Sequence, residues 1–166
     1  MKLQLTFLKH IKALSILLII VIISSSILFY LRLNIRSIIY VFIPFTIVLI
    51  LPTIYIHLNY YNIGKGHIYE LKEDGITVTE NEKFVTYSKE NFKTLEFYMS
   101  GTRFAGLALR NFPFEDYYYA KIIMNNEQEI IISCLFSKNI DQILTSFYKE
   151  VPVIKIKDFY PTIQDK

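Results

Sequence analysis

Two long stretches without a charged residue dominate the first third of this chain. Residues 13–31 and residues 38–56 are each 19 residues long and consist mostly of apolar side chains. A helix rises about 1.5 Å per residue, so roughly 20 apolar residues cross the hydrocarbon core of a bilayer. A short basic turn with Arg32 and Arg36 separates the two stretches. The pattern predicts a transmembrane helical hairpin within residues 1–61.

A secretory signal peptide is the alternative interpretation of the first stretch. Lys9 and Lys12 would form its basic end, and the serines at 24–26 would stand in for a small-residue cleavage site. The apolar run continues past these serines to Leu31, however, which makes it longer than the usual signal core. We therefore favour a helix that stays in the mature protein.

Charged residues that flank the two stretches predict the orientation of the hairpin. Basic residues favour the cytoplasmic side of a membrane. Those outside the hairpin are Lys2, Lys9, Lys12, Lys65 and Lys72. They outnumber the two arginines of the turn, which favour the opposite orientation. We expect a two-pass protein of the cell membrane with both termini in the cytoplasm.

The charge of the remaining chain limits the class of partner. Residues 1–60 carry five basic residues and no acidic residue, whereas residues 61–166 carry 13 basic and 15 acidic residues. A nucleic-acid-binding surface requires concentrated positive charge to displace counterions from phosphates. The slightly acidic second part therefore predicts no nucleic-acid partner.

Short strand patterns separated by turns follow the second apolar stretch and predict a β domain over residues 62–151. Asp74-Gly75 is a hairpin signal between two alternating segments. Strands are expected over residues 69–72, 76–79, 84–87, 92–99, 117–124 and 129–136. Residues 104–109 are expected to form a further strand or part of a loop. The even spacing favours a closed or nearly closed antiparallel sheet.

One amphipathic helix is expected after the strands. Apolar residues recur at helical spacing between Ile140 and Val151, and Pro152 forces the residue before it out of helical geometry. Such a helix would cover the open end of a small barrel. Residues 152–166 form a tail, in which the alternation over 154–157 suits an edge strand or a segment on the membrane surface.

This order of elements resembles that of the bacterial membrane proteins that carry pleckstrin-homology-like (PH-like) domains, the YcxB-like group among them. The resembling segments are Asp74–Val78, Phe84–Ser88, Phe92–Leu95, 129–136 and 139–150. The family often has Trp-Ser where this chain has Tyr87-Ser88, and this chain contains no Trp.

The resemblance implies an α+β fold, in which a PH-like barrel or sandwich with one C-terminal helix follows a hairpin in the inner membrane. It also implies a non-enzymatic module that binds a protein or a peptide next to the lipid bilayer. A small structural or accessory subunit of a larger membrane complex is the alternative function.

Two groups of residues are candidates for ligand contact. PH domains often bind phosphoinositides through basic residues near the first hairpin, where this chain has Lys65, His67 and Lys72. Because Glu70, Glu73 and Asp74 dilute that charge, no phosphoinositide site is expected. The second group is an aromatic run that is a candidate partner-binding surface. Its members are Phe112, Phe114, Tyr117, Tyr118 and Tyr119.

No arrangement of residues predicts catalysis, a metal or a cofactor. The three histidines, His10, His57 and His67, lie at the flanks of the apolar stretches, away from a plausible nucleophile. We expect His57 to act as an interfacial anchor rather than as a proton carrier. Cys134 lies in an alternating apolar segment and is expected to be a small buried hydrophobic residue.

Overall fold

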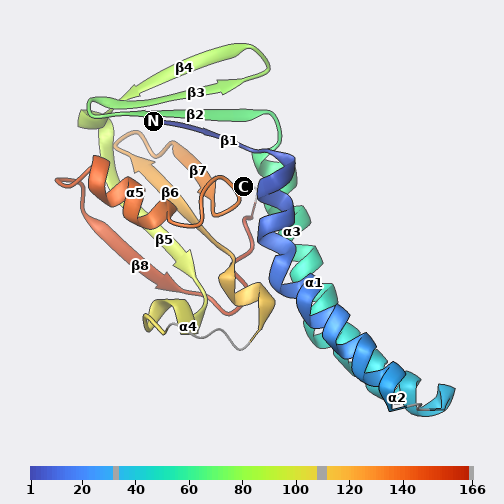
Figure 1. Ribbon diagram of the computed structural model, residues 1–166. Coiled ribbons are helices and arrows are strands. Elements are labelled where there is room, and N and C mark those ends of the chain that lie inside the picture. Colours follow the sequence, from blue (N-terminus) through green and yellow to red (C-terminus); the bar gives the residue numbers. More distant parts are fainter. Residues whose placement is uncertain (32–33, 108–111, 165–166) are drawn as a thin grey trace.

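The main elements of the part of the chain that the structure describes are two four-stranded sheets and a long helical hairpin (Figure 1). The computed structural model describes residues 1–31, 34–107 and 112–164. The hairpin runs along one side of the sheets, and its far end extends well beyond them. The result is a mixed α and β fold, as the sequence predicts.

The hairpin is longer than the two charge-free stretches. Its first arm is α1 (Phe7–Tyr30), and its second arm comprises α2 (Ile35–Phe45), the π-helical turn η1 (Thr46–Ile50) and α3 (Leu51–Gly64). Both arms are long and apolar enough to cross a membrane. The 24 residues of α1 correspond to a length of about 36 Å.

The π-helical turn ends at Ile50, shortly before Pro52. Proline has no N–H to donate to the preceding turn, and its ring crowds that turn's carbonyl group. Here the Leu51 N–H bonds to the Thr46 carbonyl, and the Thr53 hydroxyl donates to the Leu49 carbonyl at 2.6 Å. These bonds let the second arm continue as a helix past the proline.

The first sheet includes a strand at the extreme N-terminus. Its strands are β1 (Lys2–Gln4), β2 (His67–Lys72), β3 (Gly75–Glu80) and β4 (Lys83–Ser88), in that order and all antiparallel. The last three strands confirm the predicted hairpin and the strand after it. β1 was not predicted, and it pairs Leu3 with Tyr69 across the whole hairpin sequence.

The second sheet has the order β7-β6-β5-β8. Its strands are β5 (Phe92–Met99), β6 (Tyr118–Met124), β7 (Glu129–Ser133) and β8 (Val153–Lys157). β8 confirms that the tail adds an edge strand, and it lies parallel to β5. Short helices among the described residues of the domain are η2 (Lys89–Asn91), α4 (Gly101–Phe104) and η3 (Pro113–Asp116).

The segment predicted as a fifth strand or part of a loop, residues 104–109, is a loop where the structure describes it beyond Phe104. Phe104 ends α4, and the chain then turns at Gly106, which has a φ of +70°. Ser100 caps this short helix by accepting a hydrogen bond from the Arg103 N–H. Residues 108 and 109 of the predicted segment lie outside the described residues.

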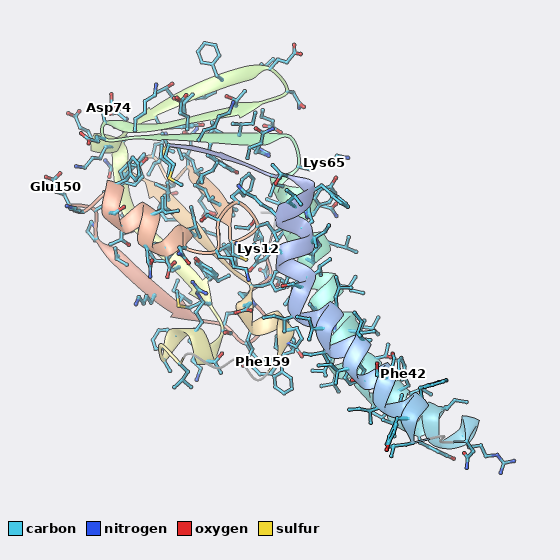
Figure 2. All side chains as sticks on the ribbon, viewed as in Figure 1. Lys12, Phe42, Lys65, Asp74, Glu150 and Phe159 are labelled. Atoms are coloured by element: carbon cyan, nitrogen blue, oxygen red, sulfur yellow. The ribbon has the colours of Figure 1, made fainter. Side chains whose placement is uncertain are left out.

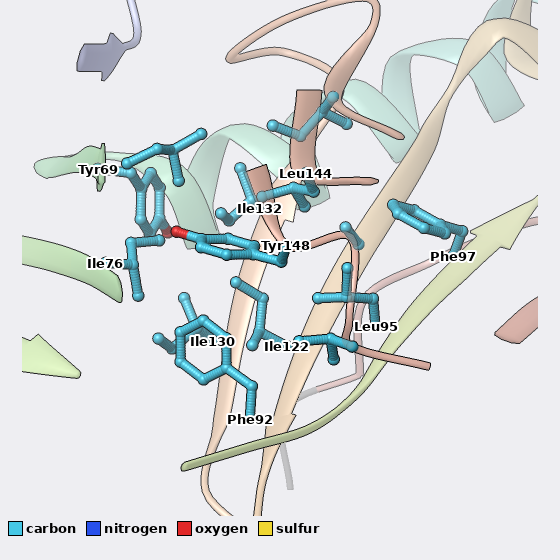
Figure 3. Close-up of a cluster of buried hydrophobic side chains, with 14 of the residues drawn as sticks. Tyr69, Ile76, Phe92, Leu95, Phe97, Ile122, Ile130, Ile132, Leu144 and Tyr148 are labelled. Atoms are coloured by element: carbon cyan, nitrogen blue, oxygen red, sulfur yellow. The ribbon is translucent and has the colours of Figure 1, made fainter. Parts of the chain in front are cut away.

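The main core lies between the two sheets and under α5 (Ile140–Phe147) (Figure 3). Ile76 comes from the first sheet, Ile122 and Leu95 come from the second, and Leu144 comes from α5. The Tyr148 hydroxyl donates a hydrogen bond of 2.8 Å to the Gly75 carbonyl and so ties α5 to the first sheet. The predicted C-terminal helix is therefore confirmed, although it ends at Phe147.

The prediction of a closed or nearly closed barrel is wrong. Among the described residues, the eight strands form two separate ladders, and no pairing closes them into one sheet. β4 ends one edge of the first sheet, and β8 ends one edge of the second. Periodicity along the chain shows where strands occur but not which strands pair, and the parallel pairing of β8 with β5 is one pairing that it does not reveal.

Candidate functional site

The aromatic run is buried rather than exposed. Tyr118 faces the main core, whereas Tyr117 and Tyr119 face the other side of the second sheet, where α3 covers them. Phe114 is also buried, and Phe112 stacks on it with ring centroids 5.2 Å apart. The candidate partner-binding rings therefore do not form one free surface, because a second layer packs on the outer face of the sheet.

That second layer joins the hairpin to the β domain. We call the contact formed by His10, His57, Tyr60 and Tyr117 the junction. The Tyr60 ring packs against Tyr117 and Tyr119 with centroid distances of 5.7 Å and 5.9 Å. Ile56 and Tyr60 are both completely buried there. The junction therefore makes the end of the second arm part of a hydrophobic core.

Polar atoms cross the junction in a short chain. A hydrogen bond of 2.9 Å joins His57 Nδ1 to the Tyr117 hydroxyl, and one of 3.2 Å joins His57 Nε2 to His10 Nδ1. Burial raises the pKa of Tyr117 well above its ordinary value, so its hydroxyl stays protonated. His57 thus links both arms of the hairpin to the domain.

The C-terminal segment fastens the same end of the hairpin. The Tyr60 hydroxyl donates to the Pro161 carbonyl at 2.5 Å. Asn59 makes two bonds to the backbone of Ile163, accepting its N–H at 2.8 Å and donating to its carbonyl at 3.0 Å. The tail therefore reaches across the second sheet and holds α3.

The three residues considered for a head group do not form one site. Lys65 follows α3 at one end of β2, and Lys72 lies at the other end, about 20 Å away along a strand. His67 lies 3.5 Å from the Glu80 carboxylate and stacks on Tyr69. The three side chains are thus spread along the strand, whereas a phosphoinositide site needs basic side chains that converge on one point.

The largest apolar exposure on the β domain is on a strand edge that the sequence did not single out. Phe84 and Val85 of β4 are 75% and 51% exposed. In the part of the chain that the structure describes, no strand pairs with the outer edge of β4. Phe84-Val85 is an ordinary strand sequence. Only the sheet order shows that its strand, β4, is an unpaired edge strand among the described residues.

The possible metal ligands and the single cysteine are the remaining reactive groups to place. No group of three or more His, Cys, Asp or Glu residues suited to a metal occurs among the described residues. Burial raises the pKa of the Cys134 thiol to about 12, so this cysteine is not a reactive thiolate. The geometry offers a hairpin packed on the β domain, an exposed strand edge and a core between two sheets.

Comparison with known proteins identifies the family. The PH domain family model matches residues 2–143, which includes both β1 and the hairpin sequence that interrupts the first sheet. No curated protein and no solved structure matches this chain. The match extends from the N-terminal strand to α5, so it covers the strands of both sheets apart from β8. This chain belongs to the PH domain family.

Proposed function

We propose that this protein is a PH-domain binding module that its hairpin anchors in the cell membrane, and that it works without catalysis. One observation carries the proposal: the hairpin has apolar side chains all round and is hardly covered by the rest of the chain. Only 6% of the residues in the apolar window of α1 are buried, and 11% in that of the second arm. The core helix of a soluble protein would be mostly covered.

The ends of the hairpin support an orientation for the anchor. β1 holds the start of α1 in the first sheet, and β2 follows the end of α3 directly. Both ends therefore leave the membrane on the side of the β domain. With the basic flanks, this favours a domain at the cytoplasmic face of the inner membrane and a short loop on the other side.

Extraction of membranes at alkaline pH tests the anchor. The full chain should stay with the membrane pellet, because about 20 apolar residues per arm bury their surface in lipid. As a control, a variant with Ile19→Lys, Ile23→Lys and Ile47→Lys places charges on exposed positions of both arms and should move to the supernatant. A wild-type chain found in the supernatant would contradict the proposal.

The free edge of β4 supports an extended segment of a partner protein as the ligand. An added strand gains backbone hydrogen bonds from an uncovered edge and contacts from its side chains. β4 lies at the end of the domain away from the hairpin tip, so a soluble partner can reach it (Figure 1). Phe84 and Val85 would supply apolar contact on opposite faces of the strand.

A proline at the edge tests strand addition. Glu80 pairs with Lys83 beside a two-residue turn, so the next residue, Phe84, directs its N–H to the open edge. Phe84→Pro should therefore abolish capture of the partner in a cellular photo-crosslinking experiment, while the domain stays folded. Phe84→Thr keeps the N–H and should retain part of the capture. Equal capture by both variants would exclude strand addition.

The accessory-subunit function predicts a different crosslinking pattern. Its supporting observation is the same uncovered hairpin, since protein rather than lipid could cover it. A photo-crosslinker at Ile22, which is exposed on α1, should label lipid if the hairpin is an anchor. Protein adducts at Ile22 without adducts at Val85 would favour the subunit function.

A further inference from the structure

A basic pocket lies where the hairpin meets the β domain. It has a volume of about 330 Å³ and opens between α1, β1 and the segment that joins β7 to α5. Its polar lining comes from Lys2, Lys9, Lys12, Ser137, Lys138 and Asn139. Among the described residues that line it, none is acidic. Three lysines from the N-terminal segment and the sequence-distant Lys138 thus surround one cavity.

The position of one lysine is fixed by the fold. The Lys9 ammonium donates to the Gln4 carbonyl at 2.8 Å and to the Phe136 carbonyl at 2.7 Å. These neutral acceptors hold the side chain without cancelling its charge. Lys2, Lys12 and Lys138 are exposed and free to turn toward a bound anion.

The acidic residue that follows the pocket is engaged elsewhere. Asp141, in the first turn of α5, accepts a hydrogen bond of 2.7 Å from the Tyr118 hydroxyl. Its carboxylate also lies 3.3 Å from the Arg103 guanidinium, which stacks on the Tyr118 ring. Because Arg103 compensates this carboxylate, the pocket keeps its positive charge.

The position of the pocket along α1, at the start of the apolar stretch, indicates its ligand. Lys12 is the last charged residue before the apolar stretch 13–31, and Ala13, the first residue of that stretch, also lines the pocket. Figure 2 shows Lys12 where α1 runs beside the domain, before the helix extends beyond it. In a membrane-anchored chain, this is the level at which the hydrocarbon core ends and phosphate groups begin.

We propose that this pocket binds the phosphate of an anionic phospholipid in the leaflet next to the domain. The acyl chains would lie against the exposed apolar side chains of α1 below Ala13, such as Ile16. The inference rests on the proposed membrane anchor, since it needs the bilayer at the level of Lys12. The bound lipid would fix the domain against the membrane surface beside its own hairpin.

The experiment compares lipids in bilayers of defined composition. The purified full chain is placed in phosphatidylcholine nanodiscs with increasing phosphatidylglycerol, and bound lipid is counted by native mass spectrometry after gentle release. We expect saturable retention of phosphatidylglycerol over phosphatidylcholine. The double variant K12Q/K138Q should weaken that preference by roughly tenfold or more, because each lysine near anionic lipid contributes noticeably to binding.

Matched controls separate the pocket from general positive charge. K65Q/K83Q removes the same charge from exposed lysines outside the pocket and should leave the preference unchanged. Equal effects of the two double variants would overturn the proposal. Inorganic phosphate is added in a separate arm, and displacement of the lipid at low phosphate concentration would show a free-phosphate site and overturn the lipid assignment.

Failure of the pocket and failure of the anchor give different results. If the anchor is wrong, the wild-type chain leaves the membrane in the alkaline extraction described above. If only the pocket is wrong, the chain stays in the membrane but retains phosphatidylglycerol and phosphatidylcholine equally.

Discussion

Gly75 shows how a single residue can decide whether two strands pair. It begins β3 and pairs with Lys72 across the first turn and with Ser88 of β4. A Cβ atom at this position would lie 2.1 Å from the Tyr87 carbonyl oxygen, far inside van der Waals contact. Its own carbonyl also accepts the bond from the buried Tyr148 hydroxyl. Glycine is therefore required here by close backbone approach.

Gly75→Ala should lower the free energy of unfolding by about 2 kcal/mol or more, because backbone atoms of β4 must move. Gly101→Ala is the matched control, since its Cβ would meet only the flexible end of Lys157, at 2.9 Å from Cε. That control should change stability by less than about 0.5 kcal/mol. Unfolding of each full chain in detergent, followed by circular dichroism, gives the comparison; equal stabilities would refute this account of Gly75.

At the scale of elements, the tail and the second arm of the hairpin depend on each other. β8 pairs with β5, and the chain then crosses to α3, where Asn59 bonds both backbone groups of Ile163. Ile163 itself belongs to the cluster around Tyr60 and Tyr117. A segment after the last strand thus acts as a strap between the sheet and the hairpin.

Asn59→Ala should release this strap, because it removes both bonds to Ile163 and leaves the backbone groups without partners. The free energy of local unfolding of this segment should fall by about 1–3 kcal/mol. Amide exchange over residues 159–164 should therefore accelerate by roughly tenfold to a hundredfold. Asn62→Ala changes an exposed residue of the same helix and should leave exchange unaltered. Hydrogen exchange with mass spectrometry measures both, and unchanged protection in the Asn59 variant would argue against the strap.

At the scale of the whole molecule, the hairpin and the β domain are not separable units. β1 supplies Leu3 to the main core, and α3 supplies Ile56 and Tyr60 to the second core. All three residues precede residue 62, where the sequence predicts the β domain to begin. The domain therefore needs residues from both ends of the hairpin to cover its sheets.

A fragment of residues 62–166 should consequently be unstable or aggregate, because the outer faces of Tyr117 and Tyr119 would be exposed. A chain in which a short Gly-Ser linker replaces residues 18–50 keeps β1, the junction and the start of α3, and should be soluble and folded. Size-exclusion chromatography and thermal unfolding compare the two. A fragment as stable as the linked chain would show that the hairpin ends contribute nothing to the core.

Local patterns in the sequence determined the hairpin arms, strands β2, β3 and β4 of the first sheet, the β6–β7 hairpin and α5. Each depends on near neighbours in the chain: an uninterrupted apolar run, a turn such as Asp74-Gly75, or apolar residues at helical spacing. These signals act over a few residues, so they are readable without a tertiary structure.

Only the tertiary structure decided which faces are covered. The alternation of Tyr117, Tyr118 and Tyr119 correctly indicates a strand, but both faces of that strand are buried because α3 packs on the outer one. In the same way, β1 joins a sheet whose next strand is more than 60 residues away, and Lys2, Lys9, Lys12 and Lys138 meet at one pocket. Hydrophobic burial does not depend on distance along the sequence. Which element covers a given face of a sheet is therefore determined only by the packing of the whole chain.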